Sequence, residues 1–100
     1  MPHIIYTQPA IEDLIRLHIF LASKSVVAAG KAKIAIVKSI KKLPLMPEAH
    51  KPVLSHPNIR DLIIDFGATG YIARYHYERG SNITILRIRH QKEIGFSDAD

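Results

Sequence analysis

The chain has 100 residues, the size of one ordinary folded domain, and 47% of them are hydrophobic, so a single core can form. It contains no cysteine, which excludes a disulfide framework, a cysteine-based zinc site and a thiol nucleophile. Lysine and arginine outnumber aspartate and glutamate by 14 to 9, and this excess suits a nucleic acid or an acidic protein as partner, or else a merely solvated surface.

The N-terminal segment does not look like a targeting signal. It has no basic region before its short apolar run, and it reaches Glu12 and Asp13 early. No apolar stretch approaches the ~20 residues that cross a bilayer. We therefore expect a cytoplasmic protein with no membrane partner.

The first 22 residues predict one strand and one helix. Residues 3–6 form a β-branched apolar run typical of a strand. Thr7 or Gln8 is the candidate N-cap of the helix that follows, with Pro9 in its first turn. Helical spacing predicts a buried stripe, made of Ile11, Leu14, Ile15, His18, Leu21 and Ala22.

A second helix is predicted from a cap at Ser25 to about Leu43, and Pro44 ends it because a proline disfavours helix in the preceding residue. Its lysines lie on the face opposite the buried stripe. The break between the helices is very short, so they should form an antiparallel hairpin. The predicted stripe consists of Ala29, Ala32, Ile36, Ile40 and Leu43.

The second half predicts strands. Residues 45–57 hold three prolines and indicate an irregular loop. Three strands follow, at 60–66, 71–78 and 83–89, and the acidic residues 91–100 are expected to form a loose tail. The order β-α-α-β-β-β predicts one α+β domain over 1–100, with an N-terminal helical hairpin packed on one face of a small antiparallel sheet.

Strand alternation then predicts which side chains face the solvent. If Tyr71, Tyr75, Leu86 and Ile88 point into the core, the opposite face of the sheet is basic. That open face would carry Arg74, His76, Arg87 and Arg89 as a basic groove.

The six histidines do not predict a metal site, because none of them forms an i, i+4 pair or a His-x-x-x-Glu helix motif. His18 is expected to be a packing residue of the first helix. A glycine-rich phosphate loop and a Ser-His-Asp order are also missing from the sequence. We expect no metal and no small-molecule cofactor.

Three segments together resemble a known family. The first helix opens with Pro-Ala-x-x-Asp-Leu at residues 9–14, Arg-x-Leu follows at 60–62, and Arg-His-Gln-Lys-Glu-x-Gly-aromatic spans 89–96. In this order, and with Gly-Tyr-x-x-Arg at 70–74, they resemble the ParE branch of the ParE/RelE toxin family over nearly the whole chain.

The resemblance implies the toxin of a type II toxin–antitoxin module, a class tied to plasmid stabilisation and growth arrest, with a cognate acidic antitoxin as partner. ParE-like members poison DNA gyrase, whereas RelE-like members cleave mRNA on the ribosome. Metal-free RNA cleavage needs groups that stabilise the phosphate and move protons. RelE-like members carry an arginine and a tyrosine for these tasks, at positions that Ile72 and Phe96 occupy here. The resemblance therefore favours a non-enzymatic gyrase inhibitor.

Three functional sets follow from the resemblance. The target-binding set is Arg74, His76, Arg87, Arg89, His90, Gln91, Lys92 and Phe96. The antitoxin-binding set is Leu14, Leu17, Leu21, Lys33, Val37 and Arg60. If the chain is instead a ribosome-dependent nuclease, the catalytic set is Arg74, Arg89, His90 and Lys92. A third hypothesis is an inactive binding module.

Overall fold

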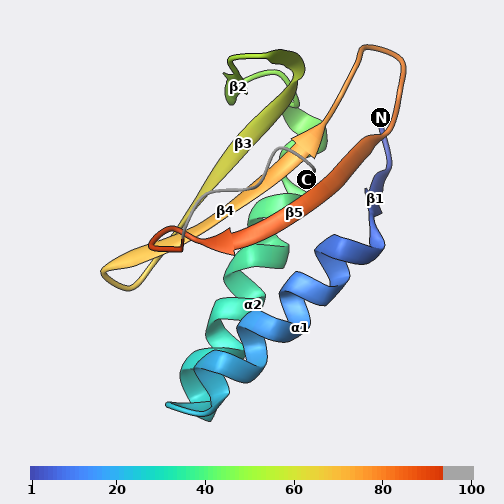
Figure 1. The fold of residues 1–100 in the computed structure, drawn as a ribbon. Helices are drawn as coiled ribbons and strands as arrows, with labels where there is room; N and C mark the ends of the chain where they lie inside the picture. The colour runs from blue at the N-terminus through green and yellow to red at the C-terminus, as the bar shows by residue number, and fades with distance from the viewer. Residues whose placement is uncertain (94–100) are drawn as a thin grey trace.

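The structure is a computed structural model that describes residues 1–93. Two helices are followed by the strands of one sheet, so the predicted α+β order is confirmed (Figure 1). The elements are β1 (Ile4–Tyr6), α1 (Gln8–Ala22), α2 (Val26–Lys41), the 3-10 turn η1 (Leu43–Leu45), β2 (Lys51–Val53), β3 (His56–Phe66), β4 (Thr69–His76) and β5 (Ile83–His90).

The sheet has the strand order β1-β5-β4-β3-β2, and its strands pair antiparallel from β2 to β5. It differs from the prediction in two ways. β1 runs parallel to β5, so the sheet is mixed rather than antiparallel throughout. The two strands are far apart in the sequence, and no local sequence pattern predicts their pairing. A short edge strand, β2, forms where an irregular loop was predicted, and Pro52 is tolerated there because β2 pairs on one side alone.

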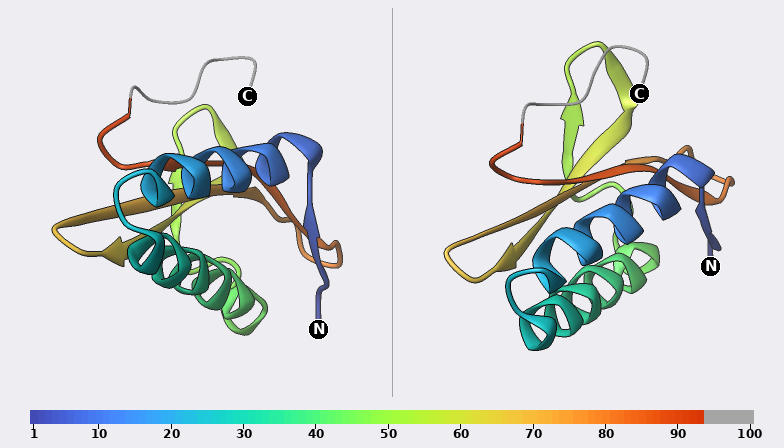
Figure 2. Two further views of the ribbon diagram at one scale, coloured as in Figure 1. Left: turned by 90° about the horizontal axis from the view of Figure 1, so that it is seen from below. Right: turned by 60° about the horizontal axis from the view of Figure 1, so that its bottom comes forward.

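Both helices begin at the predicted caps. Thr7 Oγ1 accepts a hydrogen bond from Ala10 N at 3.2 Å, and Ser25 Oγ accepts one from Ala28 N at 3.1 Å. The helices lie side by side as a hairpin, with α2 packed against the face of the sheet at β3 and α1 alongside β5 (Figure 2). The tip of this hairpin projects beyond the strands, and no helix of residues 1–93 lies on the other face of the sheet (Figure 1).

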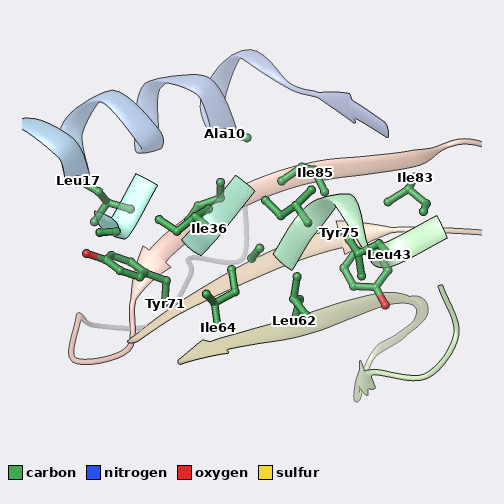
Figure 3. Close-up of a cluster of buried hydrophobic side chains, with 14 residues drawn as sticks. Ala10, Leu17, Ile36, Leu43, Leu62, Ile64, Tyr71, Tyr75, Ile83 and Ile85 are labelled. Carbon is green, nitrogen blue, oxygen red and sulfur yellow. The ribbon is translucent and has the colours of Figure 1, made fainter. Parts of the chain in front are cut away.

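The core lies between the helices and one face of the sheet (Figure 3). The predicted stripe of α2 is confirmed, as are Tyr71, Tyr75 and Ile88 in the sheet. The Tyr75 hydroxyl donates to the carbonyl of Pro47 at 2.7 Å, and burial raises the pKa of Tyr75 to about 12. That hydrogen bond attaches the segment between η1 and β2 to the core.

The predicted buried stripe of α1 is confirmed in part, because Leu14 and Leu21 pack partly buried against the core. Ala10, Asp13 and Leu17 are buried, whereas Ile11, Ile15 and His18 are exposed. The helix is apolar around most of its circumference, so its spacing alone fits more than one orientation. Asp13 decides the orientation, because its carboxylate bonds to β5.

Leu86 also departs from the prediction. A bulge shifts the register of β4 and β5, so that Arg74 lies opposite Arg87 but Tyr75 lies opposite Ile85. The extra residue lets Ile83, Ile85 and Ile88 all enter the core, while Leu86 is only half-buried. Strict alternation cannot predict such a change of face.

Candidate functional site

The face of the sheet without helices carries neighbouring rows of side chains from β3, β4 and β5. Asp61, Arg74 and Arg87 form one row across the strands. The next row holds Ile63, Ile72 and Arg89. The predicted basic groove is therefore a mixed surface, in which a carboxylate and two isoleucines lie among the arginines.

Arg74 is paired with a carboxylate on its own face. Its Nε and Nη2 donate to the two oxygens of Asp61 at 2.9 and 3.0 Å. A two-point contact of this kind holds the guanidinium in one orientation and offsets its charge. Arg74 therefore contributes less positive charge to this face than the sequence predicts.

Arg87 is drawn towards α1. Its Nε donates to Asp13 Oδ2 at 2.8 Å and its Nη2 to Oδ1 at 3.2 Å. Asp13 is 3% exposed and also accepts the backbone N–H of Ile88 at 2.8 Å. This pair fastens the helix to the strand, so the position of Arg87 has a structural explanation.

Arg89 organises the chain that follows β5. Its Nη1 donates to the carbonyls of His90, Gln91 and Glu93, the last at 3.0 Å. It lies opposite Ile72, on the face without helices. Its guanidinium thus holds the turn at residues 90–93.

His90 lies on the other face of the sheet, opposite Tyr71, whose ring it meets edge-on at 5.4 Å. Its Nδ1 accepts the backbone N–H of Lys92 at 3.1 Å, which places the ring proton on Nε2, within 2.9 Å of Thr69 Oγ1. Both ring nitrogens are therefore engaged in hydrogen bonds within the fold.

The predicted catalytic set does not gather at one point. Arg74 and Arg89 lie on one face and His90 on the other, while Lys92 is exposed beyond the end of β5. Of the predicted target-binding set, His76 lies on the same face as Arg74 and Arg89. It is four residues along β4 from Ile72, which is opposite Arg89, so it lies about 13 Å from that row. Gln91 bonds through its backbone to Gly70, and Phe96 lies outside the described residues.

The predicted antitoxin set is gathered in part. Leu14, Leu17, Leu21 and Lys33 line one small hollow between α1 and α2, whereas Val37 and Arg60 lie outside it. Leu17 belongs to the core, and Leu14, Leu21 and Val37 are half-buried, whereas Lys33 is exposed. Arg60 points to the helix side, where its Nη1 donates to the carbonyl of His50 at 2.7 Å. Burial, and then the charge of Arg60, lowers the pKa of His50.

α1 also carries an exposed apolar stripe. Its members are Ile11, Ile15, Ile19 and Phe20, and the last two are each 63% exposed. They recur at helical spacing, but the same helix offers a second apolar stripe, and the sequence does not say which one is buried. Large side chains exposed together on one helix are typical of a protein-binding surface.

A groove opens next to this stripe, between the C-terminal half of α1, the β3–β4 turn and the segment after β5. Its volume is about 760 Å³. Leu17, Phe20, Leu21, Phe66 and Tyr71 give it apolar walls. Arg16, His90, Lys92 and Glu93 lie along its rim, so the groove combines apolar contact with ionic groups.

Residues 1–93 include no helix long and apolar enough to span a bilayer. In this described part of the chain, no three His, Asp or Glu side chains gather as ligands for a metal ion.

Comparison with known proteins links this geometry to one family. A family model described as the ParE toxin of the type II toxin–antitoxin system, parDE, matches residues 4–95. Among solved structures, a chromosomal ParDE toxin–antitoxin system from P. aeruginosa is similar in fold, with a TM-score of 0.75 and 24% sequence identity over 90% of this chain and 96% of that one. A search of curated proteins gave no match.

Proposed function

The chain belongs to the ParE toxin family of type II toxin–antitoxin modules, and from that premise we propose that it inhibits DNA gyrase through protein–protein contact. Gyrase acts on chromosomal DNA, so the proposed place of action is the cytoplasm. A cognate acidic antitoxin would neutralise the toxin. The family assignment is the observation that carries this proposal.

The arrangement of the arginines favours protein contact over RNA cleavage. A nuclease needs charges that converge on one phosphate and a group that transfers protons. Here Asp61 pairs with Arg74, Asp13 pairs with Arg87, and the ring nitrogens of His90 are both engaged. Ile72 lies opposite Arg89 in the sheet, and its aliphatic side chain cannot act as an acid or a base.

The proposed gyrase-binding surface is the face without helices. It would use the exposed Ile63 together with Ile72, Arg74, His76 and Arg89. An apolar centre with charged residues around it is the usual composition of a protein interface. Arg87 and His90 leave the proposed contact set, because Arg87 is paired with Asp13 of α1 and His90 lies on the face that the helices cover.

The proposed antitoxin surface is the apolar stripe of α1. An amphipathic helix of the antitoxin could lie against Ile11, Ile15 and Ile19, as peptide helices do on apolar surfaces. The chain's charge of +5 favours an acidic partner. Folding of the antitoxin segment on the toxin would let a disordered tail cover a large surface.

A supercoiling assay with purified gyrase tests the proposed target. Folded toxin, checked by circular dichroism, should reduce supercoiling of relaxed plasmid in a dose-dependent way, and Ile63→Glu toxin should do so less. Unchanged supercoiling at saturating folded toxin would count against the proposal. Codon-specific mRNA cuts on translated messages, abolished by Arg89→Ala, would instead identify a ribosome-dependent nuclease.

A further inference from the structure

The rim of the groove holds a network of charges centred on Arg16. Arg16 Nη1 donates to Glu93 at 3.0 Å, and Nη2 lies 3.5 Å from Asp13 Oδ1. Glu93 also accepts the backbone N–H of His90 at 3.0 Å. The segment after β5 is thus held against α1 by an ion pair whose two side chains are both partly exposed, at 48% and 37%.

The walls of the groove can hold a bulky apolar side chain. Phe20 is 63% exposed although it lines the groove, and Leu21 and Phe66 are half-buried. Apolar side chains left open to water in a concave site gain free energy when a partner covers them. Phe20 also borders a second, shallower apolar hollow that contains Ile15 and Ile19, so the groove continues into the exposed stripe of α1.

The groove also offers hydrogen-bond donors to an anion. The hydroxyl end of Tyr71 points out of the core near Leu17 (Figure 3), and burial raises the pKa of Tyr71 above its ordinary value of 10.0. Lys92 is exposed at the rim, where its ammonium adds positive charge. Together with Arg16, these groups make the groove complementary to an apolar side chain next to a carboxylate.

We propose that this groove receives a segment of the antitoxin that carries a bulky apolar side chain beside an aspartate or glutamate, and that Glu93 occupies the place of that carboxylate on Arg16 until the segment binds. This inference rests on the proposed neutralisation by an acidic antitoxin. Glu93 is then an internal competitor, because the incoming carboxylate must displace it from the guanidinium.

The proposal predicts effects of opposite sign from neighbouring residues. Glu93→Gln keeps an oxygen for the His90 N–H but releases Arg16, so it should tighten binding of an acidic segment about threefold. Lys92→Gln removes an attracting charge and should weaken binding about threefold. Phe20→Ser removes an apolar wall and should weaken it about tenfold or more. General damage to the fold would weaken binding in all three variants.

The probe is a short fluorescein-labelled peptide with Leu and Phe set between Asp and Glu residues, and fluorescence anisotropy measures its binding to the full-length toxin. Two further peptides have Ser in place of Leu and Phe, or Lys in place of the acidic residues. We expect the first peptide to bind, and the other two to bind at least tenfold more weakly.

Matched variants lie outside the groove. Ile34→Ser changes an equally exposed apolar residue of α2, and Lys31→Gln changes an exposed lysine there, so neither should alter binding of the peptide. Equal binding of the Ser-substituted peptide, an unchanged affinity of Phe20→Ser, or weaker binding by Glu93→Gln would overturn the proposal.

The toxin's own activity separates this inference from the proposed function. Inhibition of gyrase by toxin alone does not depend on the groove, so the supercoiling assay tests the target independently. If an antitoxin neutralises wild-type toxin and the Phe20→Ser and Lys92→Gln variants equally well, the groove is not its docking site. Neutralisation that is weakened by Phe20→Ser and by Lys92→Gln, but not by Ile34→Ser or Lys31→Gln, would support the groove.

Discussion

At the scale of single residues, Asp13 fixes the packing of the first helix. A carboxylate that is 3% exposed must be paired, because burying an isolated charge is costly. Asp13 has Arg87, Arg16 and the Ile88 N–H as partners. The Ile88 N–H lies on the outer edge of β5 beyond the three-residue strand β1, so the carboxylate satisfies a donor that no neighbouring strand reaches.

Asp13→Ala should destabilise the fold by about 3 kcal/mol, because it leaves Arg87 and the Ile88 N–H without this acceptor. Urea unfolding followed by circular dichroism measures the loss. Glu12→Ala, one residue earlier and exposed, is the control and should change stability by less than about 0.5 kcal/mol. Equal effects of the two substitutions would show that the Asp13 pair contributes nothing specific.

Tyr75 makes the stability of the fold depend on pH in the alkaline range. Burial raises its pKa to about 12 from an ordinary value of 10.0, so the folded state holds the phenolic proton more tightly than the unfolded state. The resulting stabilisation is complete below pH 10 and is lost as the pH rises through 12. The free energy of unfolding should therefore fall over this window, and denaturant titrations at several pH values measure the fall.

Tyr75→Phe should reduce that alkaline loss without abolishing it, since burial also raises the pKa of Tyr6 and Tyr71. At neutral pH the variant should be about 1 kcal/mol less stable, because the Pro47 carbonyl loses its donor. Tyr77→Phe is the comparison, as its side chain is only half-buried. A pH profile of Tyr75→Phe identical to that of the wild type would contradict the assignment.

At the scale of elements, the β3–β4 hairpin depends on close contact between backbones. Its two-residue turn begins with Gly67 at φ +62°, a conformation that favours glycine. Gly70 follows on β4, where an added Cβ would fall on the carbonyl oxygen of Ile64 in the paired strand. This contact is with backbone, which cannot rotate away as a side chain does.

Two glycine substitutions should therefore change stability in opposite directions. Gly70→Ala should destabilise the protein by more than about 2 kcal/mol, because β3 and β4 must separate to admit the methyl group. Gly30→Ala in α2 meets open space and should stabilise it by about 0.5–1 kcal/mol through better helix propensity. Thermal unfolding of both variants is the measurement. An unchanged melting temperature of Gly70→Ala would show that β3 and β4 separate at little cost.

At the scale of the whole molecule, the fold separates two candidate surfaces. The helices cover one face of the sheet, and α1 presents its exposed apolar stripe away from the core. Within residues 1–93, no helix lies on the other face of the sheet, to which the exposed Ile63 of β3 belongs (Figure 2). A partner bound to α1 and a target bound to the sheet would thus contact different parts of the toxin.

Substitutions on the two surfaces should therefore affect different activities. Ile15→Glu on α1 should weaken antitoxin binding about tenfold or more and leave gyrase inhibition intact. Ile63→Glu should weaken gyrase inhibition and leave antitoxin binding intact. Both side chains are about half exposed, at 54% and 55%, so neither change should disturb the core. Loss of both activities in either variant would mean that the two surfaces are not independent.

The sequence by itself determined the local structure. Caps at Thr7 and Ser25, the buried stripe of α2 and the alternation along β4 each depend on neighbouring residues, and the structure follows them. Composition and the ordered motifs were also enough to suggest the toxin family. Local propensity and periodicity are properties of short segments, so the sequence displays them directly.

Tertiary structure alone decided the orientation of α1, the parallel pairing of β1 with β5, and the bulge at Leu86. Each depends on groups far apart in the chain, above all on the contact between Asp13 and the strand that holds Arg87 and Ile88. The same long-range pairing places carboxylates beside the arginines that the sequence predicted as a basic groove. Charge and hydropathy patterns describe what a side chain is, whereas only the folded chain sets which partner it meets.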